Sequence, residues 1–173
     1  MINALERRDV ATADVAGAYL NADMDDYVLM CLVGDDVDLM CDVNPSYGPY
    51  VTREGRKRVL YLRLAKALYG CVKSAMLWYR LFTSTLQGLG FVLNPYDSCV
   101  ANATIEGKQC TIVWYVDDNK ISHCDSCVVS DIIKKIEKCF GKMTVTQGDE
   151  HDFLGMHIVF DRQGHHHDVL ILT

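Results

Sequence analysis

Two adjacent aspartates, Asp117 and Asp118, follow an apolar run over residues 112–116. Adjacent carboxylates repel each other and resist burial unless a positive charge lies beside them. A third aspartate, Asp14, stands near the end of a strand-like segment over residues 10–15. If these segments are neighbours in one sheet, the three carboxylates meet at one edge, where such a trio can hold two Mg²⁺ ions. The pattern predicts the two-metal chemistry of polymerases and nucleases.

Length and composition predict one folded domain. The chain has 173 residues, of which 50% are hydrophobic and 23% charged, so it can build a packed core. Its net charge of −6 disfavours a protein whose whole surface binds nucleic acid, but it is compatible with an acidic active site. The polar N-terminus, and the absence of an apolar run of about 20 residues, predict an intracellular protein without a signal peptide or membrane span.

Eight cysteines are scattered along the chain. Several lie in apolar runs, Cys110 among them, and are predicted to be buried free thiols. Cys124 and Cys127 form a C-x-x-C pair, but no second pair completes the four ligands of a zinc site. The pair is therefore interpreted as structural or incidental, and the three histidines at 165–167 as a polar turn.

The first part of the chain predicts strands and loops. Residues 10–15 are strand-like, and residues 17–21 turn away from them. Prolines and glycines over residues 35–50 predict an extended loop or irregular strands. The basic stretch 53–58 predicts a solvated, charged hairpin turn before a strand at 59–62.

The second part predicts two amphipathic helices and two strand hairpins. Apolar residues recur at helical spacing over 74–90, and again after Asp125 or Ser126, either of which can cap a helix that Gly141 ends. The predicted strands cover residues 99–105, 110–116, 120–123, 143–146 and 153–160. Asp117 and Asp118 are expected to form the turn of the first hairpin. This order predicts an α+β fold with helices packed on one face of an antiparallel sheet.

Four sequence blocks resemble those of copia-type LTR retrotransposon reverse transcriptases. YVDD at 115–118 is similar to their Y-x-D-D box, and DVAGAYLNA at 14–22 is similar to their D-V-x-x-A-[FY]-L-N-[GA] block. ALYG with the following WY, at 67–79, and FLGM at 153–156 resemble two further blocks of the family. All four keep the family's order over residues 9–160. The resemblance implies a polymerase palm, with partial fingers and no complete thumb.

The resemblance implies roles at the metal site. Asp14, Asp117 and Asp118 would be the catalytic carboxylates that bind two Mg²⁺ ions, with Mn²⁺ as an alternative. The backbone carbonyl of Val15 would complete a metal shell. One ion would activate the primer 3′-hydroxyl, and the other would hold the triphosphate and the leaving pyrophosphate.

The resemblance also implies substrate contacts. Gly17 and Ala18 would offer backbone N–H groups to the triphosphate, and Tyr19 would block a ribose 2′-hydroxyl and so select deoxynucleotides. The residues expected to contact the primer are Tyr115, Val116, Leu154 and Gly155. The implied partners are an RNA or DNA template, a DNA or tRNA-type primer, and dNTPs.

The sequence departs from the family pattern after its L-Y-G block. Lys73 stands where the family usually has a glutamine that touches the incoming nucleotide; a lysine can meet a phosphate but cannot copy the amide's hydrogen bonds. Ala75 and Met76 replace a frequent proline and arginine. By comparison with the family pattern, residues 1–173 are expected to lack the upstream finger strands, a thumb and an RNase H domain, and residues 161–173 resemble no block of the family. Residues 1–173 are therefore interpreted as a single reverse transcriptase domain fragment of a larger polyprotein, which holds primer-template weakly on its own.

Three functions are compatible with these residues. The first is the RNA-directed DNA polymerase of a copia-type element, in a cytoplasmic virus-like particle where the element is active. The second is a catalytically inactive remnant that keeps only the folded palm, which Lys73 and the missing parts favour. The third, a palm-like nucleotidyl cyclase or other nucleotidyltransferase, shares the metal chemistry but does not explain the L-Y-G and F-L-G blocks. The retained aspartate trio favours the polymerase.

Overall fold

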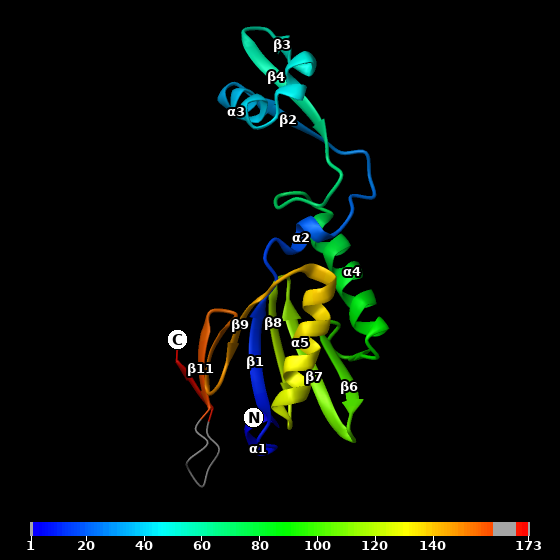
Figure 1. Ribbon diagram of the computed structural model, residues 1–173, viewed down its shortest axis with the longest axis vertical. Helices are drawn as coiled ribbons and strands as arrows, with labels where there is room; N and C mark the ends of the chain where they lie inside the picture. The colour runs from blue at the N-terminus through cyan, green and yellow to red at the C-terminus, as the bar shows by residue number, and fades with distance from the viewer. Residues whose placement is uncertain (1, 161–168, 173) are drawn as a thin grey trace.

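The computed structural model describes residues 2–160 and 169–172, whose arrangement is shown in Figure 1. In chain order the elements are α1 (Ile2–Leu5), β1 (Asp9–Asp14), α2 (Ala18–Asn21), β2 (Leu29–Val33), α3 (Asp35–Val43), the 3-10 helix η1 (Pro45–Tyr50), β3 (Thr52–Glu54), β4 (Lys57–Arg63), α4 (Ser74–Gly88), β5 (Val92–Leu93), β6 (Val100–Ile105), β7 (Lys108–Tyr115), β8 (Asp118–His123), α5 (Ser126–Phe140), β9 (Thr144–Gln147), β10 (Glu150–Phe153), β11 (Met156–Phe160) and β12 (Val169–Leu172). No helix in these residues has the length and apolar character needed to cross a membrane.

A six-stranded antiparallel sheet forms the centre of the molecule, with the strand order β5-β6-β7-β8-β1-β9. Helices α4 and α5 lie across one face of it (Figure 1). This arrangement confirms the predicted α+β class with helices on one face of an antiparallel sheet. Because β1 is inserted between β8 and β9, the strand that carries Asp14 lies directly beside the strand that follows Asp117.

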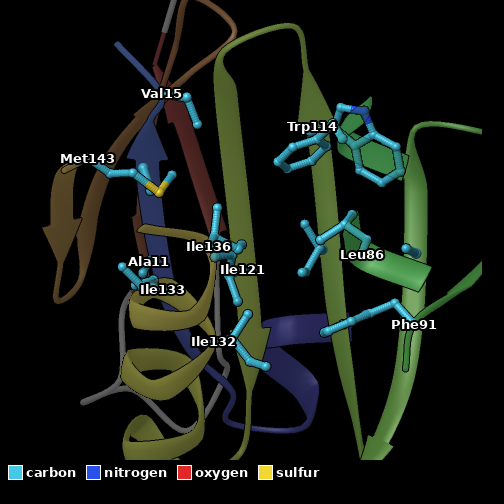
Figure 2. Close-up of a cluster of buried hydrophobic side chains, with 14 of the residues drawn as sticks. Ala11, Val15, Leu86, Phe91, Trp114, Ile121, Ile132, Ile133, Ile136 and Met143 are labelled. Atoms are coloured by element: carbon cyan, nitrogen blue, oxygen red, sulfur yellow. The ribbon is translucent and has the colours of Figure 1, made fainter. Parts of the chain in front are cut away.

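The core lies between this sheet and the two helices (Figure 2). Successive side chains of a strand point to opposite faces, so β7 and β8 turn Ile112, Trp114 and Ile121 toward the helices. The 3.6-residue period of α5 supplies Ile132 and Ile136 from the other side. Two different periodicities thus meet in one apolar layer.

Helix α5 begins and ends where the sequence predicts. The side chain of Asp125 accepts a hydrogen bond from the backbone N–H of Cys127 at 2.8 Å, which satisfies one of the free N–H groups of the first turn. The helix ends at Gly141, whose φ of 87° is rarely adopted by residues with a side chain. Helix α4 likewise matches the predicted segment and ends at Gly88.

The sheet face opposite α4 and α5, here called the open face, carries the other set of side chains. Its members include Thr12 and Asp14 on β1, Asp118 and Lys120 on β8, and Val113 on β7. Beside β1, a second sheet of order β10-β11-β12 packs on this face. The apolar contacts come from Val10, Val113, Phe153, Met156, Ile158 and Phe160.

A third sheet, β2-β4-β3, lies with α3 at the far end of the molecule (Figure 1). It contains the predicted charged hairpin, in which Glu54 pairs with Lys57. The predicted loop over 35–50 is wrong, because α3 and η1 occupy most of it. Three aspartates in the first turn favour α3 through the helix dipole. Only Val37 of this helix is buried, so the sequence lacks the apolar stripe by which a helix is recognised.

Two hairpin predictions are displaced from the structure. Tyr115 pairs with Asp118, so the β7–β8 turn consists of Val116 and Asp117, and Asp118 belongs to β8. The predicted strand over 153–160 is interrupted at Leu154 and Gly155, whose φ values of 53° and 73° reverse the chain between β10 and β11. The first turn is therefore shifted by one residue from its predicted position, and the second lies inside a segment predicted as one strand. Both are two-residue hairpin turns.

The prediction of buried thiols in apolar runs holds for Cys110 and is wrong for Cys31. Cys31, Cys124, Cys127 and Cys139 are exposed. The two-residue period of β2 turns Cys31 outward although its neighbours are apolar. The histidines at 165–167 lie outside the described residues.

Replacing Ile136 by alanine tests the core layer. Ile136 is fully buried in α5, so Ile136→Ala is expected to lower the free energy of unfolding by about 2–5 kcal/mol. Leu39→Ala is the control, because Leu39 is 65% exposed on α3 and its loss should cost less than about 0.5 kcal/mol. Urea unfolding followed by circular dichroism measures both. Equal losses would contradict this assignment of the core.

Candidate active site

Strands β1 and β8 bring Asp14 and Asp118 together at one edge of the main sheet. The register pairs the two residues directly, and Asp117 lies in the turn that precedes Asp118. Directly opposed residues have Cβ atoms about 4.5–5.5 Å apart. The backbone N–H of Val15 donates to the carbonyl of Asp117 at 3.1 Å, which continues the pairing of β1 up to the turn. The three predicted carboxylates are therefore neighbours.

Two side chains hold the turn between β7 and β8. Val116 has a φ of 56°, which is a rare conformation for a β-branched residue. The indole N–H of Trp78 donates to the Val116 carbonyl at 2.7 Å. The amide Nδ2 of Asn119 donates to the Asp117 carbonyl at 2.6 Å. Each carbonyl of the turn thus has its own donor from the core, while Tyr115 at the end of β7 is exposed.

Asn119 also links the turn to β1. Its side chain is fully buried, and Nδ2 donates to the carbonyl of Ala13, the residue before Asp14, at 3.2 Å. Its Oδ1 has no hydrogen-bond partner among the described residues. Sequence reasoning missed both Asn119 and Trp78 as site residues. Their contacts depend on the pairing of distant segments, and no local pattern marks them.

The carboxylates at this edge repel one another. Partial burial raises the pKa of Asp14 above its ordinary value of 3.8, and the charges of Asp117 and Asp118 raise it further. The pKa of Asp118 is also raised, first by burial and then by the charge of Asp117. A proton or a cation relieves this repulsion.

Tyr69 is a third residue that sequence reasoning missed. Its hydroxyl donates to Oδ2 of Asp117 across 3.4 Å, and its ring centroid lies 4.3 Å from that of Tyr19. Burial, followed by the charge of Asp117, raises the pKa of Tyr69, so the hydroxyl stays protonated as a donor. The L-Y-G block contains this tyrosine, which is the only signal that could have found it. The contact spans 48 residues of sequence.

Gly17, Ala18 and Tyr19 follow β1 closely, as the start of α2. Gly17 adopts a left-handed conformation with a φ of 63°. The side-chain amide of Asn21 donates to the carbonyls of Gly17 and Ala18 at 3.4 and 3.3 Å, which holds this short helix together. Ala18 is buried and Tyr19 half-buried. Three of the four predicted nucleotide contacts therefore lie within five residues of Asp14 along the chain, and the fourth is Lys73.

Lys73 is held by acids. Its ammonium forms ion pairs with Asp26 and, at 3.6 Å, with Asp25. The hydrogen bond to Asp26 raises the pKa of Lys73, and the charges of both aspartates add to the shift. As the side chain lies, its charge is compensated by the segment between α2 and β2.

Leu154 and Gly155 form the turn of the β10–β11 hairpin, and both are exposed. Strand β10 packs against β1 and β8. The ammonium of Lys120 lies 5.6 Å from the ring centroid of Phe153, the residue before Leu154. This hairpin is therefore anchored to the strand that carries Asp118.

Comparison with known proteins identifies the family. A family model described as reverse transcriptase (RNA-dependent DNA polymerase) matches residues 1–168. The chain belongs to this family. No match was found among curated proteins. Among solved structures, apo telomerase from Candida tropicalis, truncated from its C-terminal domain, aligns with a TM-score of 0.48 and 12% identity over 99% of this chain. The chain spans 38% of the length of that telomerase chain.

The oxygen ligands at this sheet edge are of the kind that binds divalent cations. Asp14, Asp117 and Asp118 offer the hard oxygen ligands that Mg²⁺ prefers, and their mutual repulsion is relieved by positive charge. In the described part of the chain, no group of three or more acidic, histidine or cysteine side chains is drawn together closely enough to share an ion. The fit therefore rests on ligand chemistry and on the shared sheet edge.

Replacing Trp78 by phenylalanine tests the hold on the turn. The variant keeps a large ring in the core but leaves the Val116 carbonyl without its donor. Trp78→Phe is expected to be less stable than Trp114→Phe by about 1 kcal/mol. Trp114 is a matched control because it is equally buried and its indole makes no hydrogen bond among the described residues. Chemical unfolding measures the difference, and equal stability of the two variants would contradict the role of this bond.

Removing one carboxylate is expected to stabilise the fold at neutral pH. The pKa of Asp118 is raised in the folded state, so its charge opposes folding above the raised value, and this opposition is absent below 3.8. The side chain is partly solvated, which keeps the effect small. Asp118→Asn should raise the Tm by about 1–3 °C at neutral pH.

Thermal unfolding by circular dichroism at a series of pH values checks this expectation. The gain in Tm should shrink to nothing as the pH falls through the carboxyl range. Asp131→Asn, an exposed change on α5, should show no such gain. A lower Tm for Asp118→Asn at neutral pH would show that the edge carboxylates do not repel.

Proposed function

We propose that this chain is the catalytic palm of an RNA-directed DNA polymerase from a copia-type retrotransposon. The observation that carries the proposal is the pairing of Asp14 with Asp118 at one sheet edge, with Asp117 in the adjoining turn. The substrates would be a dNTP, a DNA or tRNA-type primer, and an RNA or DNA template. The reaction is attack of the primer 3′-hydroxyl on the α-phosphate of the dNTP, with release of pyrophosphate.

The three aspartates, with the backbone carbonyl of Val15, would hold two Mg²⁺ ions, or Mn²⁺ in their place. When bound, such ions supply activation of the 3′-hydroxyl and neutralisation of charge on the triphosphate. The protein contributes position: the β1–β8 register fixes Asp14 opposite Asp118. Asn119 and Trp78 fix the turn that carries Asp117. Catalysis would then rest on preorganised charge and alignment.

The residues after β1 would receive the nucleotide. The backbone N–H groups of Gly17 and Ala18 would meet the triphosphate, and the ring of Tyr19 would exclude a ribose 2′-hydroxyl. The contact with Tyr69 supports the role of Tyr19, because a ring packed against a second ring holds its place against a sugar. On the primer side, Tyr115 and Val116 would line the terminus, and Leu154 and Gly155 would press on the primer backbone.

A catalytically inactive remnant is the second candidate function. The observation that favours it is the pairing of Lys73 with Asp25 and Asp26, which holds the lysine on acids of the chain itself. In the polymerase, Lys73 would leave these acids and meet a phosphate of the incoming nucleotide. The two candidates therefore differ in whether the chain extends a primer.

Primer extension with a matched variant separates the candidates. A labelled DNA primer on an RNA template, with dNTPs and Mg²⁺, should be extended by the wild-type chain and not by Asp117→Asn. A loss of at least about a hundredfold is expected, because the change removes one charged ligand of the reacting centre. Asp131→Asn, the same change on the exposed side of α5, should retain extension.

Two other outcomes would count against the polymerase. No extension by any of the three proteins, with all three folded by circular dichroism, would favour the inactive remnant. Extension that Asp117→Asn retains would remove the aspartate edge from the reaction. Omission of Mg²⁺ and addition of a chelator complete the comparison, since extension must stop in both.

A further inference from the structure

A cavity of about 450 Å³ opens on the open face, away from the carboxylate edge. Strands β6, β7 and β8 form its floor, and Asn3 and Arg8, from the start of the chain, also line it. The polar side chains on the floor are Asn102, Gln109, Thr111, Lys120 and Ser122. None of the described residues that line it is acidic, although the chain as a whole carries a net charge of −6.

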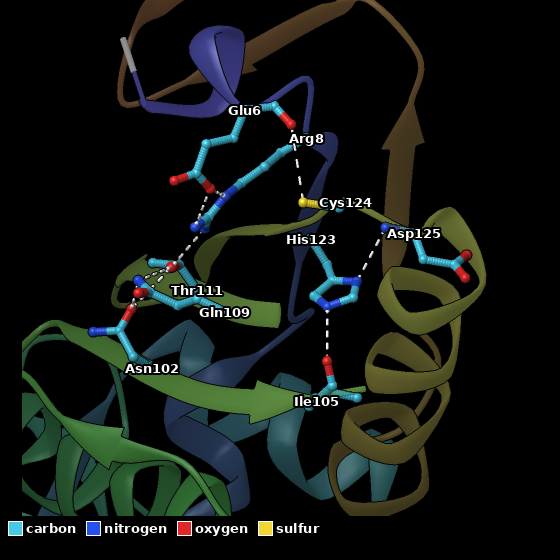
Figure 3. Close-up of polar contacts among 9 residues, drawn as sticks. All are labelled: Glu6, Arg8, Asn102, Ile105, Gln109, Thr111, His123, Cys124 and Asp125. Carbon is cyan, nitrogen blue, oxygen red and sulfur yellow. Dashed lines mark hydrogen bonds and ion pairs between the residues drawn. The ribbon is translucent and has the colours of Figure 1, made fainter. Parts of the chain in front are cut away.

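A hydrogen-bond network orients the side chains on the floor of this cavity (Figure 3). Arg8, only 4% exposed, is paired with Glu6 at 2.7 Å and donates to Thr111 Oγ1 at 3.0 Å. The Thr111 hydroxyl and Gln109 Nε2 both donate to Asn102 Oδ1, each at 2.8 Å. Since its oxygen accepts twice, Asn102 is locked with its NH₂ group as a donor without a partner among the described residues.

Lys120 supplies the cavity with a cation. The charge of Arg8 is matched by Glu6, whereas Lys120 has no carboxylate partner in the described part of the chain and lies over the ring of Phe153. A donor-rich, acid-free cavity with one uncompensated cation is suited to an anion.

The position of the cavity indicates where the anion comes from. Lys120 lies on the same strand and face as Asp118, two residues further along β8, or about 7 Å. This distance corresponds to about two nucleotide steps of a duplex strand, at roughly 3.4 Å of axis each. Lys120 also touches Phe153, next to the hairpin turn at Leu154.

We propose that this cavity binds a backbone phosphate of the primer strand, a few nucleotides behind its 3′ end, through Lys120 and the amide of Asn102. The inference rests on the proposed function for the direction of the strand. A phosphate held here would align the duplex along β8, and it adds a contact that carries no sequence information.

Salt-dependent binding tests the role of Lys120. The probe is a fluorescein-labelled DNA primer annealed to an RNA template, and anisotropy is measured over a series of KCl concentrations. Lys120→Gln should bind roughly fivefold more weakly at low salt, with a log–log salt slope shallower by about 1. Lys135→Gln is the matched control, because Lys135 is exposed on α5, across the sheet. Unchanged affinity and slope for Lys120→Gln would overturn the proposal.

Asn102→Asp gives an independent test that preserves the network. An aspartate can still accept from Gln109 and Thr111, but it replaces the free NH₂ donor with a charged oxygen. It should weaken hybrid binding at least as much as Lys120→Gln, whereas Gln87→Glu on the exposed side of α4 should not. Circular dichroism confirms that each variant is folded.

The remaining outcomes separate this proposal from the proposed function. Hybrid binding that depends on Lys120, in a chain that does not extend a primer, keeps the phosphate site and removes the polymerase. Extension that Lys120→Gln leaves intact, with unchanged hybrid affinity, removes only the site. Titration with inorganic phosphate at constant ionic strength tests whether the cavity binds a free anion instead of the primer strand. Phosphate binding that depends on Lys120, with no effect of Lys120 on the hybrid, would assign the cavity to a free anion and overturn the proposal.

Discussion

Strand β7 reverses into β8 through only two residues, and Val116 adopts a φ of 56° to make this reversal. Such a conformation costs a residue with a side chain about 1–3 kcal/mol. The hydrogen bonds from Trp78 and Asn119 to the two turn carbonyls are of the same order, at about 1 kcal/mol each. They offset the strain only because both donors are buried and already positioned. With the turn fixed, Asp118 becomes the first residue of β8 and faces Asp14.

Carboxylates repel one another at the aspartate edge, whereas acids in the segment between α2 and β2 are paired with lysines. Lys66 pairs with Asp23 at 2.7 Å, and Lys73 pairs with Asp25 and Asp26. These pairs are exposed, and exposed pairs contribute about 0–1 kcal/mol each. A phosphate could therefore draw Lys73 away at little cost, which is why its present pairing is compatible with a role in nucleotide binding.

The sequence predicted the elements better than their junctions. The strand ending near Asp14, the helix over α4 and the Asp125 cap are marked by local periodicity and local hydrogen bonding, and these were correct. The turn at Val116 was missed, because a valine at positive φ contradicts its own preference and is imposed by tertiary contacts. Tyr69 was missed for a related reason, since its contact with Asp117 exists only after distant segments pack.

The register of β8 determines both which of its side chains lie on the open face and which lie in the core. Along β8, alternation places the half-buried Asp118 and Lys120 on the open face and buries Asn119 and Ile121 on the other. A slip of one residue would exchange these sets, burying a carboxylate and an ammonium and exposing Ile121 to water. Exposing one such side chain costs about 1.5–3 kcal/mol, and burying an unpaired charge costs several more. The buried layer that contains Ile121 and Trp114 therefore fixes the register of β8 and keeps Asp118 on the open face. The aspartates themselves do not stabilise this register, because their charges repel.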